Sequence, residues 1–199
     1  MSRVRPTPDR LYALAETQGG YFTSADASAL GYTTAHQHFH VKQGNWVRID
    51  RAIYRLKRFP ASRHEELIRW WLWTRKKGVI SHESAAAAYD LGEVLPSKTH
   101  VTVPQEFRKV PAPGVVLHKA KLEQKDTESR EGYRVTTPLR TILDLARAHL
   151  DPERLTAVVK DAISKGLVEK HALLDFLAAM PRGIDPATQV TLQLALREP

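Results

Sequence analysis

One stretch near the N-terminus contains two helix-sized segments followed by a segment in which apolar and polar residues alternate. Residues 24–30 form a helix-sized segment that ends at Gly31, because glycine adopts the left-handed conformation of a helix C-terminus without steric cost. A second helix is predicted over 33–43, where a threonine hydroxyl can cap the first turn. Apolar and polar residues then alternate over 46–51, which is typical of a strand, and 52–56 offers the returning strand of a hairpin.

The residues before this stretch complete a recognisable order of elements. Residues 1–7 are interpreted as a loose basic arm, and Pro8 opens a helix that Gly19 and Gly20 end. Residues 21–23 are a short β-prone segment. The order helix, strand, helix, helix, hairpin predicts a winged helix-turn-helix DNA-binding domain over 1–60, a scaffold that places its second close-packed helix in the DNA major groove.

The rest of the chain has a different pattern and predicts a second domain over 61–199. Its boundary is the Phe59-Pro60-Ala61-Ser62 segment. The fold class is therefore α/β mixed (α+β), with a mainly helical C-terminal domain that contains a small sheet. Strands are expected at 99–103, 115–118 and 133–136, with a brief extended piece at 79–80 and a charged loop at 121–132. Helices are expected at 63–77, 81–89, 137–146, 151–164, 169–179 and 186–196, and Arg140 and Asp144, one turn apart, are expected to form an ion pair.

The formal net charge of +8 is unevenly distributed between these two parts. Residues 1–78 hold 14 lysines and arginines against 6 aspartates and glutamates, whereas residues 79–199 hold 16 of each. The whole excess therefore lies in the part that contains the predicted DNA-binding domain, which favours a phosphate-binding module beside a neutral second domain.

The second helix supplies the residues expected to read DNA, although its pattern leaves its buried side open. One stripe consists of Ala35 and Phe39 with the stem of Lys42, and another of Gln37, His40 and Val41. Polar residues of the first turns usually reach base edges, and cations of the hairpin suit flanking phosphates. The candidate DNA-binding residues are Thr33, Thr34, His36, Gln37, His38 and Lys42 on the helix and Arg48, Arg51, Arg55 and Lys57 around the hairpin.

Two other patterns could suggest chemistry. His36, His38 and His40 could contact DNA, pack against the sheet or bind a metal, but no nearby carboxylate or cysteine completes a site, so we expect no metal. The run from Ser81 to Glu83 contains the residue types of a catalytic triad, but neighbours on one helix point in different directions, so Ser81 is interpreted as a helix cap. We expect no catalytic residues, no cofactor and no enzymatic activity.

Composition limits the class of protein further. The absence of cysteine excludes disulfides and thiolate metal sites. No apolar run reaches the roughly 20 residues of a membrane span, and the basic N-terminus has no apolar region behind it. We therefore expect a bacterial cytoplasmic protein that has no membrane partner and is a monomer in solution.

Four segments, in their order along the chain, resemble the AbiEi-type antitoxins of type IV toxin–antitoxin (abortive infection) systems. These are GNWVRIDRAIYRL, RHEELIRWWLWTRKKGVISHESAAAAYDLG, HVTVP and YRVTTPLRTILDLA, and the resemblance covers about Asp9 to Met180. It implies that 33–43 is the recognition helix and that 48–55 is the wing. Ala52 stands where the family's wing has a glycine, and histidines replace arginines of the helix.

The resemblance implies a DNA-binding antitoxin with two activities. The N-terminal domain would bind double-stranded DNA with inverted repeats and repress its own operon, as a transcriptional repressor under autoregulation. The C-terminal domain would counter a nucleotidyltransferase-like toxin without a stable complex. The alternative is a stand-alone winged-helix regulator whose C-terminal domain senses a ligand or partner, and a third hypothesis is a nuclease or metal hydrolase that uses the histidines.

Overall fold

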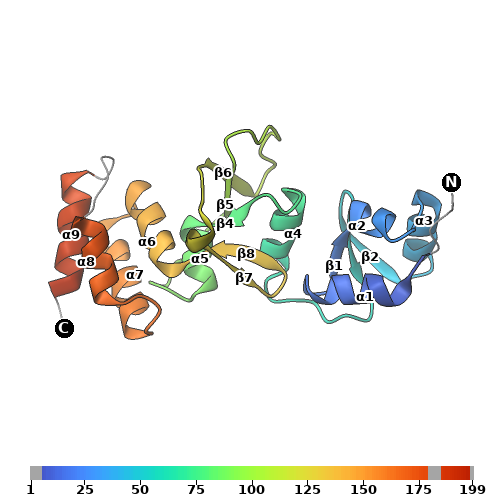
Figure 1. Ribbon diagram of the computed structural model, residues 1–199, viewed down its shortest axis with the longest axis horizontal. Helices are drawn as coiled ribbons and strands as arrows, with labels where there is room; N and C mark the ends of the chain where they lie inside the picture. The colour runs from blue at the N-terminus through green and yellow to red at the C-terminus, as the bar shows by residue number, and fades with distance from the viewer. Residues whose placement is uncertain (1–5, 179–184, 198–199) are drawn as a thin grey trace. The chain divides into compact units, whose positions relative to one another are not determined.

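The computed structural model describes residues 6–178 and 185–197, and its packing divides the chain into two compact units. Unit 1 runs to Lys77 and includes Ser129–Arg134, and unit 2 comprises Gly78–Glu128 and the chain from Val135 onward (Figure 1). Most of the expected N-terminal arm and the tail around residues 179–184 lie outside the described residues. None of the described helices is long and apolar enough to cross a membrane.

Unit 1 has the predicted order of helices and strands. A three-stranded antiparallel sheet has the order β1-β3-β2, and a bulge between Arg48 and Asp50 interrupts the alternation of β2. The elements are α1 (Pro8–Glu16), β1 (Tyr21–Thr23), α2 (Ser24–Ala29), α3 (Thr34–Lys42), β2 (Trp46–Asp50), β3 (Ile53–Leu56) and α4 (Glu65–Trp73) (Figure 1).

Aromatic rings fill the space between the first helices and this sheet. Phe22 and Trp46 meet edge to face, with ring centroids 4.8 Å apart, and the Tyr32 ring lies 5.2 Å from that of Trp46. Leu11, Ala15 and small residues of α2 complete a core from which water is excluded. Burial of these rings fixes α2 and α3 against the sheet.

Unit 1 continues past the boundary predicted at residues 60 and 61. The Arg69 guanidinium donates to the Asp50 carboxylate at 2.8 Å, and Lys76 pairs with Asp26 at the same distance. Ile68, on the same helix, is fully buried. Because α4 packs and pairs back onto the N-terminal elements, the prediction that it opens the second domain is wrong.

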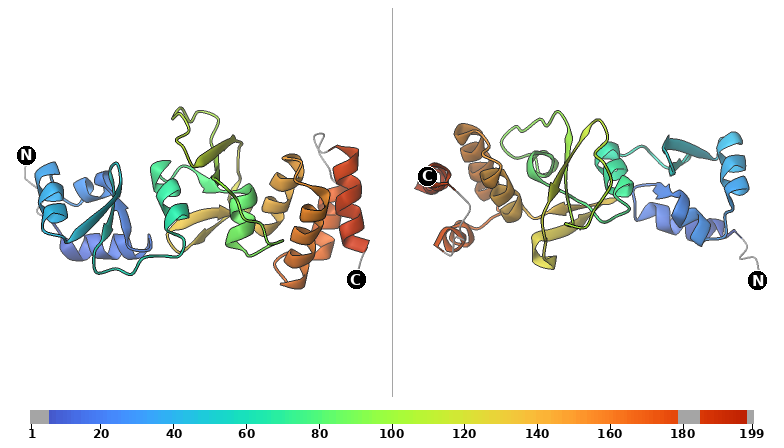
Figure 2. Two further views of the ribbon diagram at one scale, coloured as in Figure 1. Left: turned by 180° about the vertical axis from the view of Figure 1, so that it is seen from behind. Right: turned by 90° about the horizontal axis from the view of Figure 1, so that it is seen from above.

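Unit 2 consists of helices and most of a five-stranded sheet, of which the tip of the β7–β8 hairpin, Ser129–Arg134, belongs to unit 1. The strand order is β6-β5-β4-β8-β7, in which β4 and β5 are antiparallel and β5 and β6 are parallel. Figure 2 shows α6, α7 and α9 lying together, and contacts join α6 to α7 and α7 to α9. The elements are β4 (Val79–Ile80), α5 (His82–Ala88), β5 (Thr99–Val103), β6 (Val115–Lys119), a 3-10 turn (Gln124–Asp126), β7 (Thr127–Arg130), β8 (Tyr133–Thr136), α6 (Pro138–Arg147), α7 (Pro152–Ser164), α8 (Lys170–Ala178) and α9 (Pro186–Arg197).

The chain therefore has the expected mixed α+β class, with a small sheet among helices in unit 2. The main omission is β7, which lies in a segment expected to be a charged loop. The Arg140–Asp144 ion pair expected on α6 is present at 2.8 Å, and Arg140 also reaches Asp126 at 3.0 Å.

Candidate nucleic-acid interface

Helix α3 is held at its start and on one face by its own polar residues. The Thr33 hydroxyl accepts a hydrogen bond from the His36 N–H, which satisfies a free donor of the first turn. The stripe that faces the core is Gln37, His40 and Val41, so the structure settles the open choice between the two stripes.

Gln37 was predicted to reach DNA bases, and this prediction is wrong. Its side chain is 2% exposed and lies between α2 and α3. Its amide nitrogen donates to Tyr32 O and Ser28 Oγ, both at 3.1 Å, and its amide oxygen accepts from Ser24 Oγ at 2.7 Å. Gln37 therefore joins the two helices by bonds that an apolar residue could not make.

Replacement of Gln37 by Ala should lower the free energy of unfolding of unit 1 by about 2–3 kcal/mol, because it leaves the buried carbonyl of Tyr32 without this donor and opens a cavity. Urea denaturation followed by tryptophan fluorescence measures the change, since all four tryptophans lie in unit 1. The exposed neighbour His38, changed to Ala, should cost less than about 0.5 kcal/mol. Equal effects of the two substitutions would contradict the placement of Gln37.

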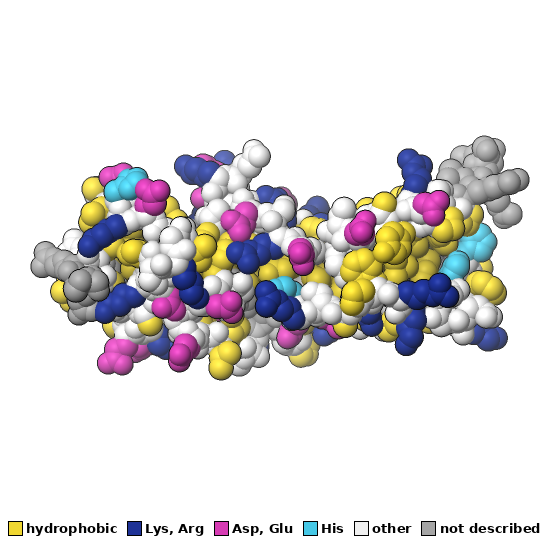
Figure 3. Space-filling model, turned by 90° about the horizontal axis from the view of Figure 1, so that it is seen from below, with side chains coloured by type: hydrophobic (Ala, Val, Ile, Leu, Met, Phe, Trp, Pro, Cys, Tyr) yellow, Lys and Arg dark blue, Asp and Glu magenta, His cyan; other side chains and the backbone are white. Residues whose placement is uncertain are grey.

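The outward face of α3 contains most of the other predicted residues and two that were not predicted. Thr33, Thr34, His36, His38 and Lys42 are exposed, as a base- or phosphate-contacting residue must be. Ala35 and Phe39 are also exposed but were not predicted as contact residues, because the sequence left open which of the two stripes is buried. In Figure 3, histidine side chains lie at the surface of unit 1 near lysine, arginine and hydrophobic side chains.

The three histidines of α3 differ in environment. His40 stacks on Trp46 with ring centroids 4.7 Å apart, and burial, followed by the nearby His36, lowers the pKa of its imidazole. His36 and His38 are exposed. Among the described residues no three histidine, cysteine, aspartate or glutamate side chains are grouped so that they could hold a metal ion. His40 is thus a packing residue.

The hairpin β2–β3 presents three of its four predicted cations to solvent. Arg48, Arg51 and Lys57 are exposed, the first two near a turn in which Ala52 has a φ of 61° and Lys57 at the other end of the hairpin. Alanine therefore adopts the left-handed conformation for which a glycine is the ordinary residue. The turn keeps the two strands antiparallel and leaves Arg48 and Arg51 accessible to phosphate groups.

Arg55 is the fourth predicted cation, and the structure gives it a different role. Its guanidinium donates to the carbonyl of Phe59 at 2.5 Å and lies 6.0 Å from the centroid of the Tyr21 ring. The side chain is half-buried within unit 1. The prediction that Arg55 contacts DNA is therefore wrong, because its hydrogen-bonding groups hold the segment that follows β3.

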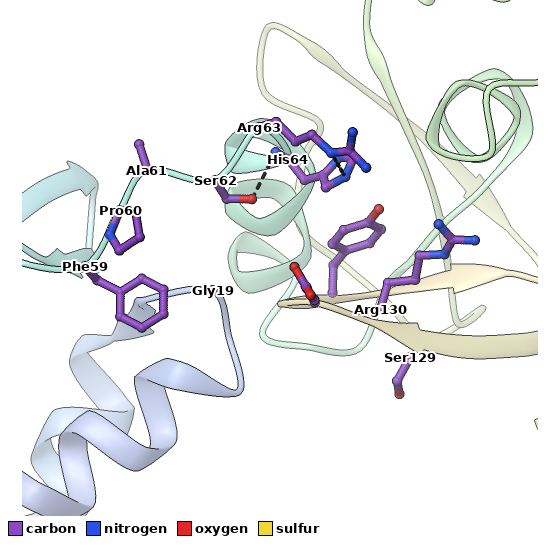
Figure 4. A pocket seen from close by; sticks show the side chains of 11 residues that line it. Gly19, Phe59, Pro60, Ala61, Ser62, Arg63, His64, Ser129 and Arg130 are labelled. Carbon is purple, nitrogen blue, oxygen red and sulfur yellow. Dashed lines mark hydrogen bonds between the residues drawn. The ribbon is translucent and has the colours of Figure 1, made fainter.

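A pocket of about 720 Å³ lies elsewhere in unit 1, where the segment after β3 meets the tip of the β7–β8 hairpin. Figure 4 shows the bonds from Arg63 to His64 and from the His64 N–H to Ser62. Because Arg63, Arg130 and Glu131 all line the pocket, its charge selects no class of ligand. The lining residues are Gly19, Phe59, Pro60, Ala61, Ser62, Arg63, His64, Ser129, Arg130, Glu131 and Tyr133.

A cluster of three histidines in unit 2 was not foreseen. His82 and His118 stack with ring centroids 3.6 Å apart, and His118 Nε2 lies 3.1 Å from His100 Nδ1. The three residues are far apart in sequence, at the start of α5, on β5 and on β6. The pairing of β5 with β6 and the packing of α5 against β5 bring them together, so their spacing contained no signal.

The cluster keeps its imidazoles neutral. Burial, and then the neighbouring His118 and His100, lower the pKa of His82 to about 3. Burial and His100 lower the pKa of His118 to about 4, and burial also lowers that of His100, where the Glu83 carboxylate acts in the opposite direction. At neutral pH, hydrogen bonds and ring stacking therefore hold the cluster together without ionic pairing among the imidazoles.

Ser81 contacts this cluster but does not form the expected side-chain cap of α5. Its hydroxyl lies 2.9 Å from His82 Nδ1 and accepts from Thr102 Oγ1 at 2.8 Å. A serine beside an imidazole is also the beginning of a nucleophile and base pair. Ser81 is fully buried, however, and a base with a pKa near 3 takes up a proton poorly at neutral pH, so this pair is structural.

No protein-family model matches the sequence, and no curated protein matches it. Among solved structures, the chain is similar to the RV2827C protein from Mycobacterium tuberculosis, with 15% sequence identity and a TM-score of 0.53. The likeness covers 98% of this chain and 83% of that protein. At this identity the similarity shows a common fold across both units.

Proposed function

We propose that unit 1 is a winged helix-turn-helix that binds double-stranded DNA, with α3 in the major groove and the β2–β3 hairpin against the flanking phosphates. The observation that carries the proposal is that α3 has an exposed polar face and that the hairpin which follows it in the chain has exposed cations. The order of elements in unit 1 and the location of the whole formal charge excess in residues 1–78 support it.

We further propose that the chain is an antitoxin that represses its own operon and counters a nucleotidyltransferase-like toxin through unit 2. The support for this part is the resemblance of the four sequence segments quoted above. If it is correct, expression of the neighbouring gene alone should halt growth, and co-expression of the full chain should restore it. A neighbouring gene that is harmless when expressed would contradict this part and favour a stand-alone regulator.

Replacement of Arg48 or Arg51 by Ala should weaken binding to every DNA sequence by a similar factor, because each substitution removes one contact to phosphate. The slope of log K against log salt should become less steep by about 0.9 for each cation removed. Fluorescence anisotropy of a labelled duplex, at four or more salt concentrations, measures both quantities.

Lys98 of unit 2 provides a matched control, since it is exposed and lies outside unit 1. Its replacement by Ala should leave the affinity and the salt slope unchanged. If the Lys98 variant loses as much affinity as the Arg48 variant, binding reflects the net charge of the chain and the assignment of the hairpin is wrong. The Arg48→Ala, Arg51→Ala double variant should still restore growth in co-expression, because the proposed antitoxin activity belongs to unit 2.

A further inference from the structure

The outward face of α3 is centred on an aromatic side chain. Phe39 is 56% exposed, and Ala35 and Lys42, four residues before it and three after it, are exposed on the same side of the helix. At 100° per residue these three positions lie opposite Gln37, which is buried. The helix thus buries an amide and exposes a phenyl ring, the reverse of ordinary hydrophobic patterning.

The core of unit 1 does not explain this reversal. Phe22, Tyr32 and Trp46 already occupy the space beneath α3, and His40 stacks on Trp46 from the helix itself. An exposed phenyl ring forgoes much of the stabilisation that its burial would supply. Phe39 therefore lies outside the core, where it meets the His40 ring edge to face at 5.6 Å between centroids, and its exposed part is available to a partner.

The charges around Phe39 indicate which partner. Lys42 shares its face, and Arg48 and Arg51 are exposed on the hairpin that follows α3. All of the formal excess of +8 lies in residues 1–78. A cation-bordered apolar centre complements a DNA major groove, where phosphates flank base edges and the thymine C5-methyl is the apolar group among hydrogen-bonding atoms.

We propose that Phe39, together with Ala35, makes the protein read the C5-methyl groups of thymine in the major groove. This inference rests on the proposed DNA-binding function and deepens it, because it makes an apolar contact, rather than the polar first turn of α3, a determinant of sequence preference. The class of ligand is double-stranded DNA with thymine at the positions that face the centre of α3.

The test uses a duplex that the full-length protein itself selects from a randomised pool, compared with the same duplex in which uracil replaces thymine at single positions. Uracil keeps every hydrogen-bonding group of thymine and lacks only the methyl. We expect affinity to fall about fourfold for each contacted methyl removed, the value for loss of one buried methylene-sized group. The salt slope should stay unchanged, because no phosphate contact is lost.

Phe39→Ala should bind the thymine and uracil duplexes equally at the positions that Phe39 contacts and keep the smaller discrimination that Ala35 supplies, while the exposed position of Phe39 leaves the fold intact. Tyr12→Ala is the matched control, since Tyr12 is a 51% exposed aromatic residue of the same unit on α1 and should preserve discrimination. Circular dichroism of each variant verifies folding.

Failure of the proposed DNA binding and failure of the proposed methyl recognition by Phe39 give different results. If no sequence is selected and binding shows no salt dependence, the proposed DNA-binding function fails. If a sequence is selected but uracil is tolerated at every position, DNA binding stands and the methyl-reading role of Phe39 is overturned. If wild-type protein self-associates in sedimentation experiments, Phe39→Ala abolishes the association and uracil has no effect, a second copy of the chain covers this face instead.

Discussion

Replacement of Gly92 by Ala should lower the free energy of unfolding of unit 2 by about 3 kcal/mol. Gly92 follows α5 with a φ of 61°, a left-handed conformation that costs an alanine about 1 kcal/mol. A Cβ at this position would lie 2.6 Å from Val158 Cγ2 and 2.9 Å from the backbone nitrogen of Val158 on α7. The side-chain methyl can turn away, but the helix backbone cannot, so the turn or α7 must shift.

The shift would also disturb bonds that hold this turn to α7. The Gly92 N–H donates to Asp161 Oδ2 at 2.8 Å, and the Lys165 ammonium donates to the carbonyl of Asp90. Val158 is fully buried, so no solvent-filled space is available to absorb the added methyl. These contacts are why the expected loss exceeds the strain of the backbone conformation alone.

Gly166 supplies the control for this prediction. It has a φ of 66°, and a Cβ placed on it would meet no atom within 4 Å. Gly166→Ala should therefore cost only the conformational strain, about 1 kcal/mol. Urea denaturation followed by far-ultraviolet circular dichroism compares the two, and equal losses would show that Gly92 does not pack closely against α7.

The local sequence pattern was sufficient to predict elements that depend on strand propensity and helix capping. The Thr99–Val103 strand has the predicted bounds, because its β-branched threonines and valines suit a strand, and four of its five residues are buried. Thr33 and Gly31 mark the start of α3 and the end of α2, and both have the expected capping role. Propensity and capping chemistry act within a few residues, which is why they can be read from the chain alone.

Elements that depend on contacts with residues distant in the chain could not be predicted from the sequence. Strand β7 consists of Thr-Glu-Ser-Arg, has no apolar face, and exists because it lies beside β8 in the sheet. The domain boundary was misplaced because Pro60 is a strong local signal, whereas the pairing of Arg69 with Asp50 and of Lys76 with Asp26 is not visible in the sequence.

The candidate interface shows the same limit within one helix. A helix with neither stripe clearly apolar gives no orientation, so its buried side was left open and Gln37 was assigned to DNA. The hydroxyls of Ser24 and Ser28 and the carbonyl of Tyr32 reverse this assignment, because together they satisfy a buried amide. Arg55 was misassigned for a similar reason, since its acceptor, the carbonyl of Phe59, is a backbone group.

Acid should destabilise unit 2 well above the pH at which carboxylates titrate, through its buried histidine cluster. The folded pKa values of His82, about 3, and His118, about 4, lie below the ordinary 6.5 that applies in the unfolded chain. The unfolded state therefore binds more protons, so the stabilisation is complete above about pH 6.5 and is lost as the pH falls towards 4. We expect unit 2 to lose about 3 kcal/mol between pH 7 and pH 5, with the half-buried His118 contributing less than His82.

The charged groups around the cluster do not offset this loss. Glu83 Oε2 lies 3.9 Å from His100 Nε2, but its other oxygen lies 3.9 Å from Arg154, so its charge is shared. Arg140 further lowers the pKa of His82. A proton added to the cluster would thus be repelled by the cations of Arg140 and Arg154 and attracted by the Glu83 carboxylate, which Arg154 also attracts.

Other titrating groups differ in sign or in pH window. Lowered pKa values make Asp26 and Asp50 contribute to acid sensitivity, but only as the pH falls below about 3.8 and through their folded values. Burial raises the pKa of Asp144, although Arg140 opposes the shift, so protonation of this carboxyl stabilises the fold as the pH falls. A loss of stability of unit 2 between pH 7 and pH 5 therefore identifies its histidines, since His40, whose lowered pKa acts with the same sign in the same window, lies in unit 1.

His118→Gln isolates the effect, because glutamine does not titrate and its amide nitrogen can occupy the place of Nε2 opposite His100 Nδ1. The variant should reduce the slope of unfolding free energy against pH between 7 and 5, both by removing one titrating group and by raising the pKa of His82. Urea denaturation followed by circular dichroism measures unit 2 together with unit 1, and tryptophan fluorescence reports unit 1 separately. His171→Gln, at a 71% exposed side chain on α8, should leave the slope unchanged. If His118→Gln retains the full wild-type slope, the cluster is not the source of acid sensitivity, and its stacked imidazoles must admit a proton without separating.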